Sequence, residues 1–102
     1  MAPFPFTDLS GHKVRPALVL HSEERNSDFI ACFISSKPKN KISRTDIKIE
    51  PTFQNGLKVN SIIKVAKIAT LEKRIILGEI GSIDQKTMKG LNSKLKNVFG
   101  LN

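Results

Sequence analysis

Short runs of apolar residues, separated by polar stretches, fill the first two thirds of the chain and predict β-strands. Residues 14–21 are mostly β-branched and aliphatic, and Pro16 near the start of this run favours an edge strand or a first-residue position. Residues 29–35 place apolar side chains on both faces, which is typical of a strand buried on two sides. Residues 45–50 alternate isoleucine with charged residues, which predicts a strand with one solvent-facing side. The polar segments between these runs are predicted to be exposed loops.

The remainder of the chain adds two strands and then changes its period. Residues 61–71 form the longest β-rich run, and residues 75–80 predict one more short strand. From Asp84 onward the apolar residues recur at the spacing of an α-helix, at Met88, Leu91, Leu95 and Val98. Asp84 or Ser82 can cap the first turn of this helix, and Gly100 ends it.

Five or so short strands followed by one C-terminal helix predict a mainly β fold. A small, strongly bent sheet or a partly open barrel, with the helix as its lid, satisfies this pattern. The chain has 102 residues and shows no internal repeat and no linker, so we expect a single domain spanning residues 1–102.

The charge of the chain narrows the classes of partner. A formal net charge of +8 makes a polyanion the leading partner: a nucleic acid, an acidic protein segment or an anionic membrane surface. The apolar runs are far shorter than the roughly 20 residues that span a bilayer, and the N-terminus does not resemble a targeting signal. We therefore expect a cytoplasmic protein that does not bind membranes.

Residues capable of nucleophilic or metal chemistry are few. The single cysteine, Cys32, lies in an apolar segment and is predicted to be a small buried residue rather than a nucleophile. His12 and His21 have the side chain suited to acid–base work, and His21 is expected at the surface. Two histidines and one cysteine at scattered positions predict no metal site, and no cofactor is expected.

Five sequence blocks occur in order along nearly the whole chain. They are FPFTDLSG with KVRPALVL, an apolar strand ending FISS, GL with a serine four residues after the leucine, IATLEK, and IGSID before the final helix. With these blocks the chain resembles the PemK/MazF family of toxin endoribonucleases of type II toxin–antitoxin systems. The resemblance implies an SH3-like small barrel of the CcdB/MazF/PemK type, with a C-terminal helix.

The resemblance also implies an activity and partners. Members of this family act as homodimers that cleave single-stranded mRNA at specific sequences without a metal, leaving 2′,3′-cyclic phosphate and 5′-hydroxyl ends. Each is neutralised by an antitoxin whose acidic, disordered tail folds over the RNA groove. We therefore expect this chain to be such an mRNA interferase, with single-stranded RNA and an acidic antitoxin as its partners.

Matching the blocks residue by residue assigns the site. Arg15 of the Val-Arg-Pro block corresponds to the catalytic arginine, and Ser35 to the catalytic threonine or serine. The loop at residues 7–13 corresponds to the mobile loop beside the active site that holds RNA. The residues expected to bind RNA are His12, Lys13, Ser36, Lys37 and Lys39.

Each assignment has a plainer alternative. Without the family block, Arg15 would be a solvated charge at a strand edge, and Ser35 a strand-end hydroxyl bonded to its own turn. A guanidinium is a planar fork of donors matched to phosphate, which favours charge stabilisation by Arg15. A basic set can line one groove and hold phosphates, or serve only solubility: Lys13, Arg15, Lys37, Lys39, Lys41 and Arg44, with Lys64 and Lys67 nearby.

Two departures from the family pattern support a second hypothesis. The strand that usually precedes the FPFTD block is reduced to Met1-Ala2, so the first strand is expected to be shortened or missing. The strand that carries an acidic residue in some relatives has Lys64-Val65-Ala66-Lys67 instead. The alternative is a non-catalytic protein of the toxin fold that binds RNA, an antitoxin or a protein target such as gyrase, as the related CcdB toxins do. A ribosomal-type SH3-like binding module is a third possibility, supported by net charge alone.

Overall fold

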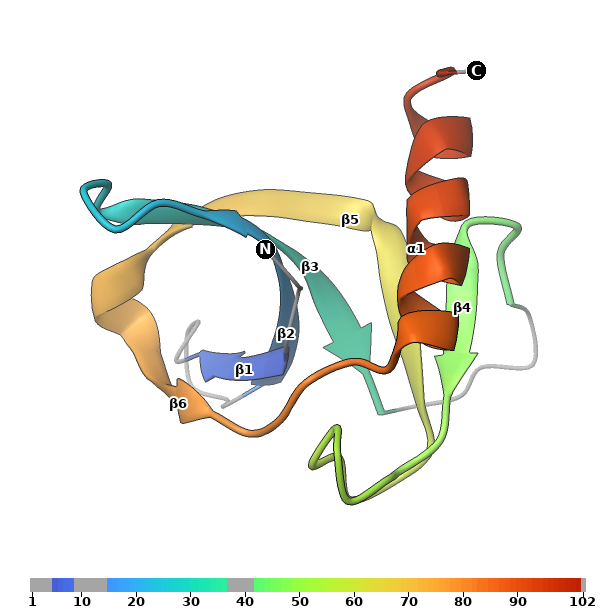
Figure 1. Cartoon of the computed structure of the whole chain (residues 1–102), viewed down its shortest axis with the longest axis horizontal. Helices are drawn as coiled ribbons and strands as arrows, with labels where there is room; N and C mark the ends of the chain where they lie inside the picture. The colour runs from blue at the N-terminus through green and yellow to red at the C-terminus, as the bar shows by residue number, and fades with distance from the viewer. Residues whose placement is uncertain (1–4, 9–14, 37–41, 102) are drawn as a thin grey trace.

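Six antiparallel strands form one bent sheet with a helix against it (Figure 1). The computed structural model describes residues 5–8, 15–36 and 42–101. The sheet order is β4-β5-β3-β2-β1-β6. The elements are β1 (Pro5–Asp8), β2 (Arg15–Ser22), β3 (Asp28–Ser35), β4 (Asp46–Ile49), β5 (Ser61–Glu72), the 3₁₀ turn η1 (Lys73–Ile75), β6 (Ile76–Glu79) and α1 (Gln85–Val98).

The mainly β fold with a C-terminal helix, predicted from the sequence, is confirmed. The first strand is short, as expected: β1 has four residues, comes from the FPFTD block itself, and lies between β2 and β6. Across the described residues β4 pairs only with β5, and β6 only with β1, so the sheet curls without closing into a barrel.

Of the two positions expected for Pro16, an edge strand or the first residue of a strand, the edge strand was wrong. β2 lies inside the sheet, and Pro16, its second residue, pairs with Thr7 of β1. Proline cannot donate a ladder hydrogen bond, and the β2–β3 ladder begins only at Ala17, opposite Phe33. β2 therefore tolerates Pro16, because its pairing with β3 begins one residue after the proline, at Ala17.

Register shifts bend the sheet. The largest lies between β3 and β5, where Cys32 pairs with Ile68 but the next residue, Phe33, pairs with Lys64. Residues 65–67 of β5 therefore have no partner on β3, and such bulges kink a strand and increase its twist. The prediction of one long run over residues 61–71 was right in extent, but the sequence pattern did not indicate the bulge.

Two apolar clusters hold the sheet, one on each face. The larger joins Leu18, Cys32 and Ile63 to Leu91, the one buried residue of α1. The smaller lies on the other face and contains Ala17, Val19, Phe29 and Ala31. As predicted, β3 is buried on both sides, and the helix is held by its apolar stripe, because Met88, Leu95 and Val98 pack against the larger cluster.

One strand prediction needs correction. Residues 45–50 were expected to turn all their polar side chains to water, but Asp46 is buried. Its carboxylate accepts hydrogen bonds from Lys64 Nζ (3.1 Å) and from the Ser43 backbone N–H (2.9 Å). Because Lys64 lies 18 residues further along the chain, the strand pattern alone gave no sign of this partner.

Candidate nucleic-acid interface

Arg15 and Ser35 lie at the same end of two neighbouring strands. Arg15 is the first residue of β2 and is exposed, whereas Ser35 is the last residue of β3 and is half-buried. The last pair of the β2–β3 ladder at this end is Ala17 with Phe33, and each of the two site residues lies two positions beyond it. The antiparallel topology thus brings together two residues that are 20 positions apart in sequence.

Ser35 belongs to a row of residues that crosses three strands. It pairs with Ile62 of β5, which pairs in turn with Lys48 of β4. Residues directly opposite one another project from the same face of a sheet, so Ser35 and Lys48 share a face. Their chain neighbours Ile34 and Ile49 pack in the larger cluster beneath α1. The face that carries Ser35 is therefore the one turned away from the helix.

Lys48 was overlooked in the sequence. Its alternation with Ile47 and Ile49 indicated a solvent-facing side chain, and Lys48 is indeed exposed. What could not be read from the alternation was the strand order, which places β4 two positions from β3. A cation on this face can hold a phosphate without selecting sequence.

One carboxylate close to this surface, that of Asp46, is already engaged. Lys64 pairs with Phe33 on one side and with Asp46 on the other, two rows from Ser35. The Asp46 side chain is only 3% exposed and forms an ion pair with Lys64, which is 24% exposed. Ala66, at the position where some relatives carry an acid, is exposed within the bulge of β5.

The other predicted site residues divide into two groups. Ser36 is exposed and directly follows β3. The remaining predicted RNA-binding residues lie outside the described residues: His12, Lys13, Lys37 and Lys39. Of the basic set, Arg44 and Lys67 are exposed, while Lys64 is held by Asp46.

The cysteine and the second histidine behave as the sequence predicted. Cys32 is fully buried, and burial raises the pKa of its thiol to about 12, which removes it as a nucleophile. His21 is exposed, with its Nε2 3.1 Å from the Glu23 carboxylate in the β2–β3 turn, away from Ser35. Across the described residues, no group of three His, Cys, Asp or Glu side chains could hold a metal ion.

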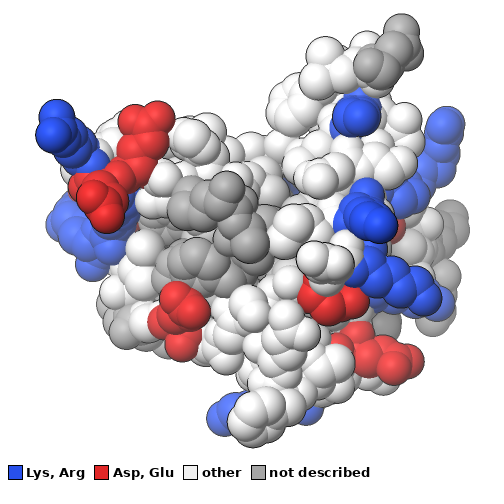
Figure 2. All heavy atoms as spheres, viewed as in Figure 1, with Lys and Arg blue, Asp and Glu red and all other residues white. Residues whose placement is uncertain are grey.

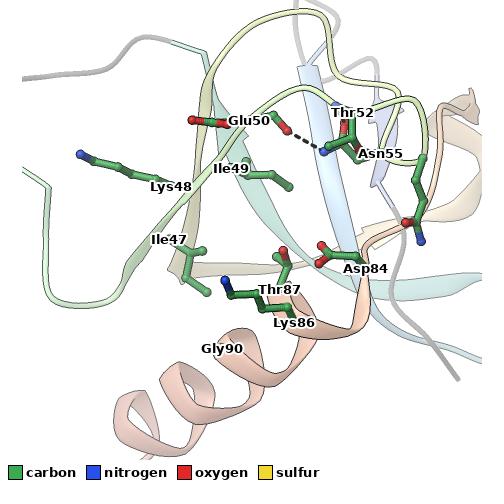
Figure 3. A pocket seen from close by; sticks show the side chains of 11 residues that line it. Ile47, Lys48, Ile49, Glu50, Thr52, Asn55, Asp84, Lys86, Thr87 and Gly90 are labelled. Carbon is green, nitrogen blue, oxygen red and sulfur yellow. Dashed lines mark hydrogen bonds between the residues drawn. The ribbon is translucent and has the colours of Figure 1, made fainter.

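An open hollow of about 520 Å³ lies on the helix side of β4. Ile47, Ile49, Asn55, Asp84 and Thr87 are among its lining residues, and neither Arg15 nor Ser35 reaches it. Figure 3 shows the side chain of Lys48 pointing away from this hollow. Lys48 is nevertheless among the residues that line the hollow, so the hollow and the face that carries Ser35 meet at β4.

Charge is unevenly spread over the face seen in Figure 2. Basic side chains gather at its right edge, where Figure 1 places α1 and β4, and acidic ones form separate groups. The exposed lysines of α1 are Lys86, Lys89 and Lys96, whereas Lys94 is half-buried and donates a hydrogen bond to the Arg44 carbonyl. No helix in the described part of the chain is long and apolar enough to cross a membrane.

Comparison with known proteins places this geometry in a family. Residues 2–99 match the family model described as PemK-like, MazF-like toxin of type II toxin-antitoxin system. A search of curated protein sequences found no match.

Solved structures share the fold at low sequence identity. A Mycobacterium tuberculosis toxin, MazF-mt6, has 20% identity and a TM-score of 0.79 over 96% of this chain and 98% of its own. A mycobacterial endoribonuclease in complex with its cognate antitoxin has 19% identity and a TM-score of 0.80, over 96% and 92%. A MazE–MazF complex from Deinococcus radiodurans has 18% identity and a TM-score of 0.79, over 99% and 95%.

Proposed function

The chain belongs to the PemK-like, MazF-like toxins of type II toxin–antitoxin systems, and we propose that it is a metal-independent endoribonuclease. Its substrate is single-stranded mRNA in the cytoplasm, cut at specific sequences. The observation that carries this proposal is the pair formed by exposed Arg15 and half-buried Ser35, at the same end of adjacent strands. A guanidinium and a hydroxyl at the same sheet end of a strongly basic chain suit a phosphodiester.

The reaction needs no group beyond RNA, the protein and water. The 2′-oxygen gives its proton to a base, His12 or a solvent water, and attacks the adjacent phosphorus; the P–O5′ bond breaks, and the 5′-oxygen takes up a proton. The products are a 2′,3′-cyclic phosphate and a 5′-hydroxyl. Arg15 stabilises the negative charge that gathers on the phosphoryl oxygens, and it can donate a proton to the leaving oxygen.

Ser35 and the basic residues position the substrate. An unassisted serine hydroxyl is a poor base, so Ser35 acts by hydrogen bonding to the scissile phosphate. Ser36 lies directly beyond β3 and continues the RNA-facing edge, and we extend RNA binding to His12, Lys13, Lys37 and Lys39. His12 has the side chain best suited to move a proton at this site.

The proposal includes two protein partners. One of the similar structures is described as an endoribonuclease in complex with its cognate antitoxin, and we extend that pairing to this chain. An acidic antitoxin tail complements the net charge of +8 and would compete with RNA for the same cations. The active toxin is a homodimer.

The test is cleavage of a long unstructured RNA in the presence of EDTA. We expect fragments with cyclic phosphate and 5′-hydroxyl ends. Arg15→Ala should lower the rate roughly 100- to 1000-fold, as removal of one charge-stabilising donor does elsewhere. The matched control is Arg25→Ala, an equally exposed arginine in the turn at the far end of β2, which should cleave at the wild-type rate.

A non-catalytic binding protein is the second candidate, and one observation favours it. Position 66 carries alanine, and the neighbouring Asp46 carboxylate is buried and bonded to Lys64, so neither supplies a free base. Intact RNA at protein concentrations that bind it fully would select this candidate over the nuclease.

A further inference from the structure

The loop between β4 and β5 holds one aromatic side chain entirely in solvent. Phe53 is 106% exposed relative to a reference residue, the most exposed of the large apolar side chains in the described residues. Turns ordinarily place polar residues at such positions, so this phenylalanine contributes nothing to the packing of its own chain. An aromatic ring at this exposed position is therefore expected to contact another molecule.

The loop around Phe53 is rigid. Asn55 is only 4% exposed, and its side-chain oxygen accepts hydrogen bonds from the backbone N–H groups of Thr52 (3.0 Å) and Leu57 (2.9 Å). Its side-chain nitrogen donates to the Glu50 carbonyl at 2.8 Å (Figure 3). The Gly56 N–H also donates to the Thr52 carbonyl at 3.0 Å. These bonds fix the backbone on both sides of the ring.

The same loop is also locked onto the segment before α1. Gly56 has φ +69°, and a Cβ there would lie 1.8 Å from the Ile80 carbonyl oxygen. A Cβ on Gly81 would lie 2.4 Å from the Gln54 carbonyl oxygen, which accepts the Ser82 N–H at 2.8 Å. Two close backbone approaches thus clamp the turn that displays Phe53, and the backbone of this turn loses little freedom when the ring meets a ligand.

The loop projects from the sheet end that carries the proposed RNA site. β5 begins at Ser61, and its next residue, Ile62, pairs with Ser35. Figure 1 shows this loop at the bottom of the view, beyond the arrowheads of β3 and β4. Lys58 in the loop and Lys48, the next-to-last residue of β4, are exposed cations. A strand of RNA held at Arg15 and Ser35 can therefore continue toward Phe53.

The surroundings of Phe53 favour a nucleobase over a protein partner. Val59 is the other exposed large apolar residue of the loop, whereas Phe99 and Leu101 follow the far end of α1. A 14-residue helix is about 21 Å long, so those two residues cannot extend the same patch. One ring and one valine supply far less than the roughly 800 Å² per partner of a stable protein interface, but they suffice for one base.

We propose that Phe53 is a stacking platform for a base of single-stranded RNA, forming a subsite that extends the Arg15–Ser35 site across the end of the sheet. The inference rests on the proposed RNA substrate and adds the residue that holds a base away from the scissile phosphate. Stacking on a ring is tolerant of base identity, so this subsite strengthens binding without reading sequence.

The chain contains no tryptophan or tyrosine, which provides a direct reporter. Phe53→Trp introduces a single indole at a fully exposed position. We expect its fluorescence to be quenched by an uncleavable 2′-O-methyl RNA 12-mer. An abasic phosphodiester of the same length should leave the fluorescence unchanged. Equal quenching by both probes would overturn the proposal, because phosphate contact alone would then account for the signal.

Affinity measurements separate stacking from general apolar contact. Phe53→Ala and Phe53→Leu should each weaken binding of the uncleavable RNA roughly 5- to 100-fold, with Phe53→Trp retaining it. The dependence of affinity on salt should be unchanged, because no phosphate contact is removed. The matched control is Phe99→Ala, an exposed phenylalanine after α1, which should bind RNA as the wild type does.

Other outcomes would overturn the stacking proposal specifically. Wild-type RNA affinity in Phe53→Ala would do so, and so would full rescue by Phe53→Leu. A change in solution mass, or in affinity for an acidic peptide, with RNA binding intact would assign Phe53 to a protein interface. RNA cleavage by the wild type is measured in a separate assay. If the wild type does not cleave RNA, the binding results for the Phe53 variants can still be interpreted.

Discussion

The buried ion pair between Asp46 and Lys64 gives the sharpest stability prediction. The Asp46 carboxylate, 3% exposed, accepts from Lys64 Nζ at 3.1 Å and from the Ser43 N–H at 2.9 Å. A hydrogen bond to a charged group contributes about 1.5–3 kcal/mol, and breaking a buried pair can cost about 3–5 kcal/mol. Lys64 is 24% exposed and can turn to water when Asp46 is lost, so the lower part of this range applies to Asp46→Ala.

We therefore expect Asp46→Ala to lower the free energy of unfolding by about 2–3 kcal/mol. For a domain of this size that corresponds to a fall in Tm of about 10–20 °C. Lys64→Met should cost more, about 3–4 kcal/mol, because it leaves a carboxylate buried with only the Ser43 N–H as partner. The double variant should cost less than the sum of the two by about 1–2 kcal/mol.

Urea unfolding followed by circular dichroism measures these differences, since the chain has no tryptophan or tyrosine. Lys67→Met is the matched control, because Lys67 is an exposed lysine in the same strand, and its cost should stay below about 0.5 kcal/mol. Strictly additive costs, or single variants as stable as the control, would refute the claim that this pair is coupled and structural.

Three further predictions concern other sites. Gly56→Ala should destabilise the protein by more than about 2 kcal/mol, because a Cβ meets the Ile80 carbonyl and φ is positive; a wild-type urea midpoint would disprove this. Alkylation of Cys32, whose pKa is about 12, should be at least roughly 1000-fold slower at pH 8 in the folded than in the unfolded protein; equal rates would contradict its burial. Thr87 lowers the pKa of the Asp84 carboxyl below 3.8, so this carboxylate stabilises the folded state above that pH and loses the effect as pH falls through the folded pKa. The loss of Tm caused by Asp84→Asn should therefore shrink as the pH falls from 7 through the folded pKa, and a loss that does not depend on pH would exclude this linkage.

The spacing of apolar residues along the chain was sufficient to predict the C-terminal helix and the strand that is buried on both faces. Leu91 and Leu95 recur at helical spacing and do pack on the sheet, and the two apolar faces of residues 29–35 do lie in two clusters. Both signals arise from neighbours within a few residues, which the sequence displays directly.

Pairings across the sheet could not be predicted from such patterns. The burial of Asp46 depends on Lys64, 18 residues away, and the internal position of Pro16 depends on the strand order. The role of Asn55 in clamping the Phe53 loop depends on how Gly56 and residues 80–82 approach one another. Each of these follows from tertiary contacts, which no periodicity encodes.

For the site itself, family resemblance supplied Arg15 and Ser35, and the antiparallel topology puts them at one end of neighbouring strands. Lys48 and Phe53 were not singled out, because neither belongs to a quoted block. The sequence feature that could have indicated Lys48 is a lysine on the solvent-facing side of an alternating strand. For Phe53 it is an aromatic residue within a turn.

The most direct test of the central claim is end analysis of RNA incubated with the wild type, Arg15→Ala and Arg25→Ala in EDTA. We expect cyclic-phosphate and 5′-hydroxyl ends from the wild type and Arg25→Ala, and a roughly 100- to 1000-fold slower reaction from a folded Arg15→Ala. Uncut RNA in the wild-type sample, or equal cleavage by Arg15→Ala, would contradict this claim.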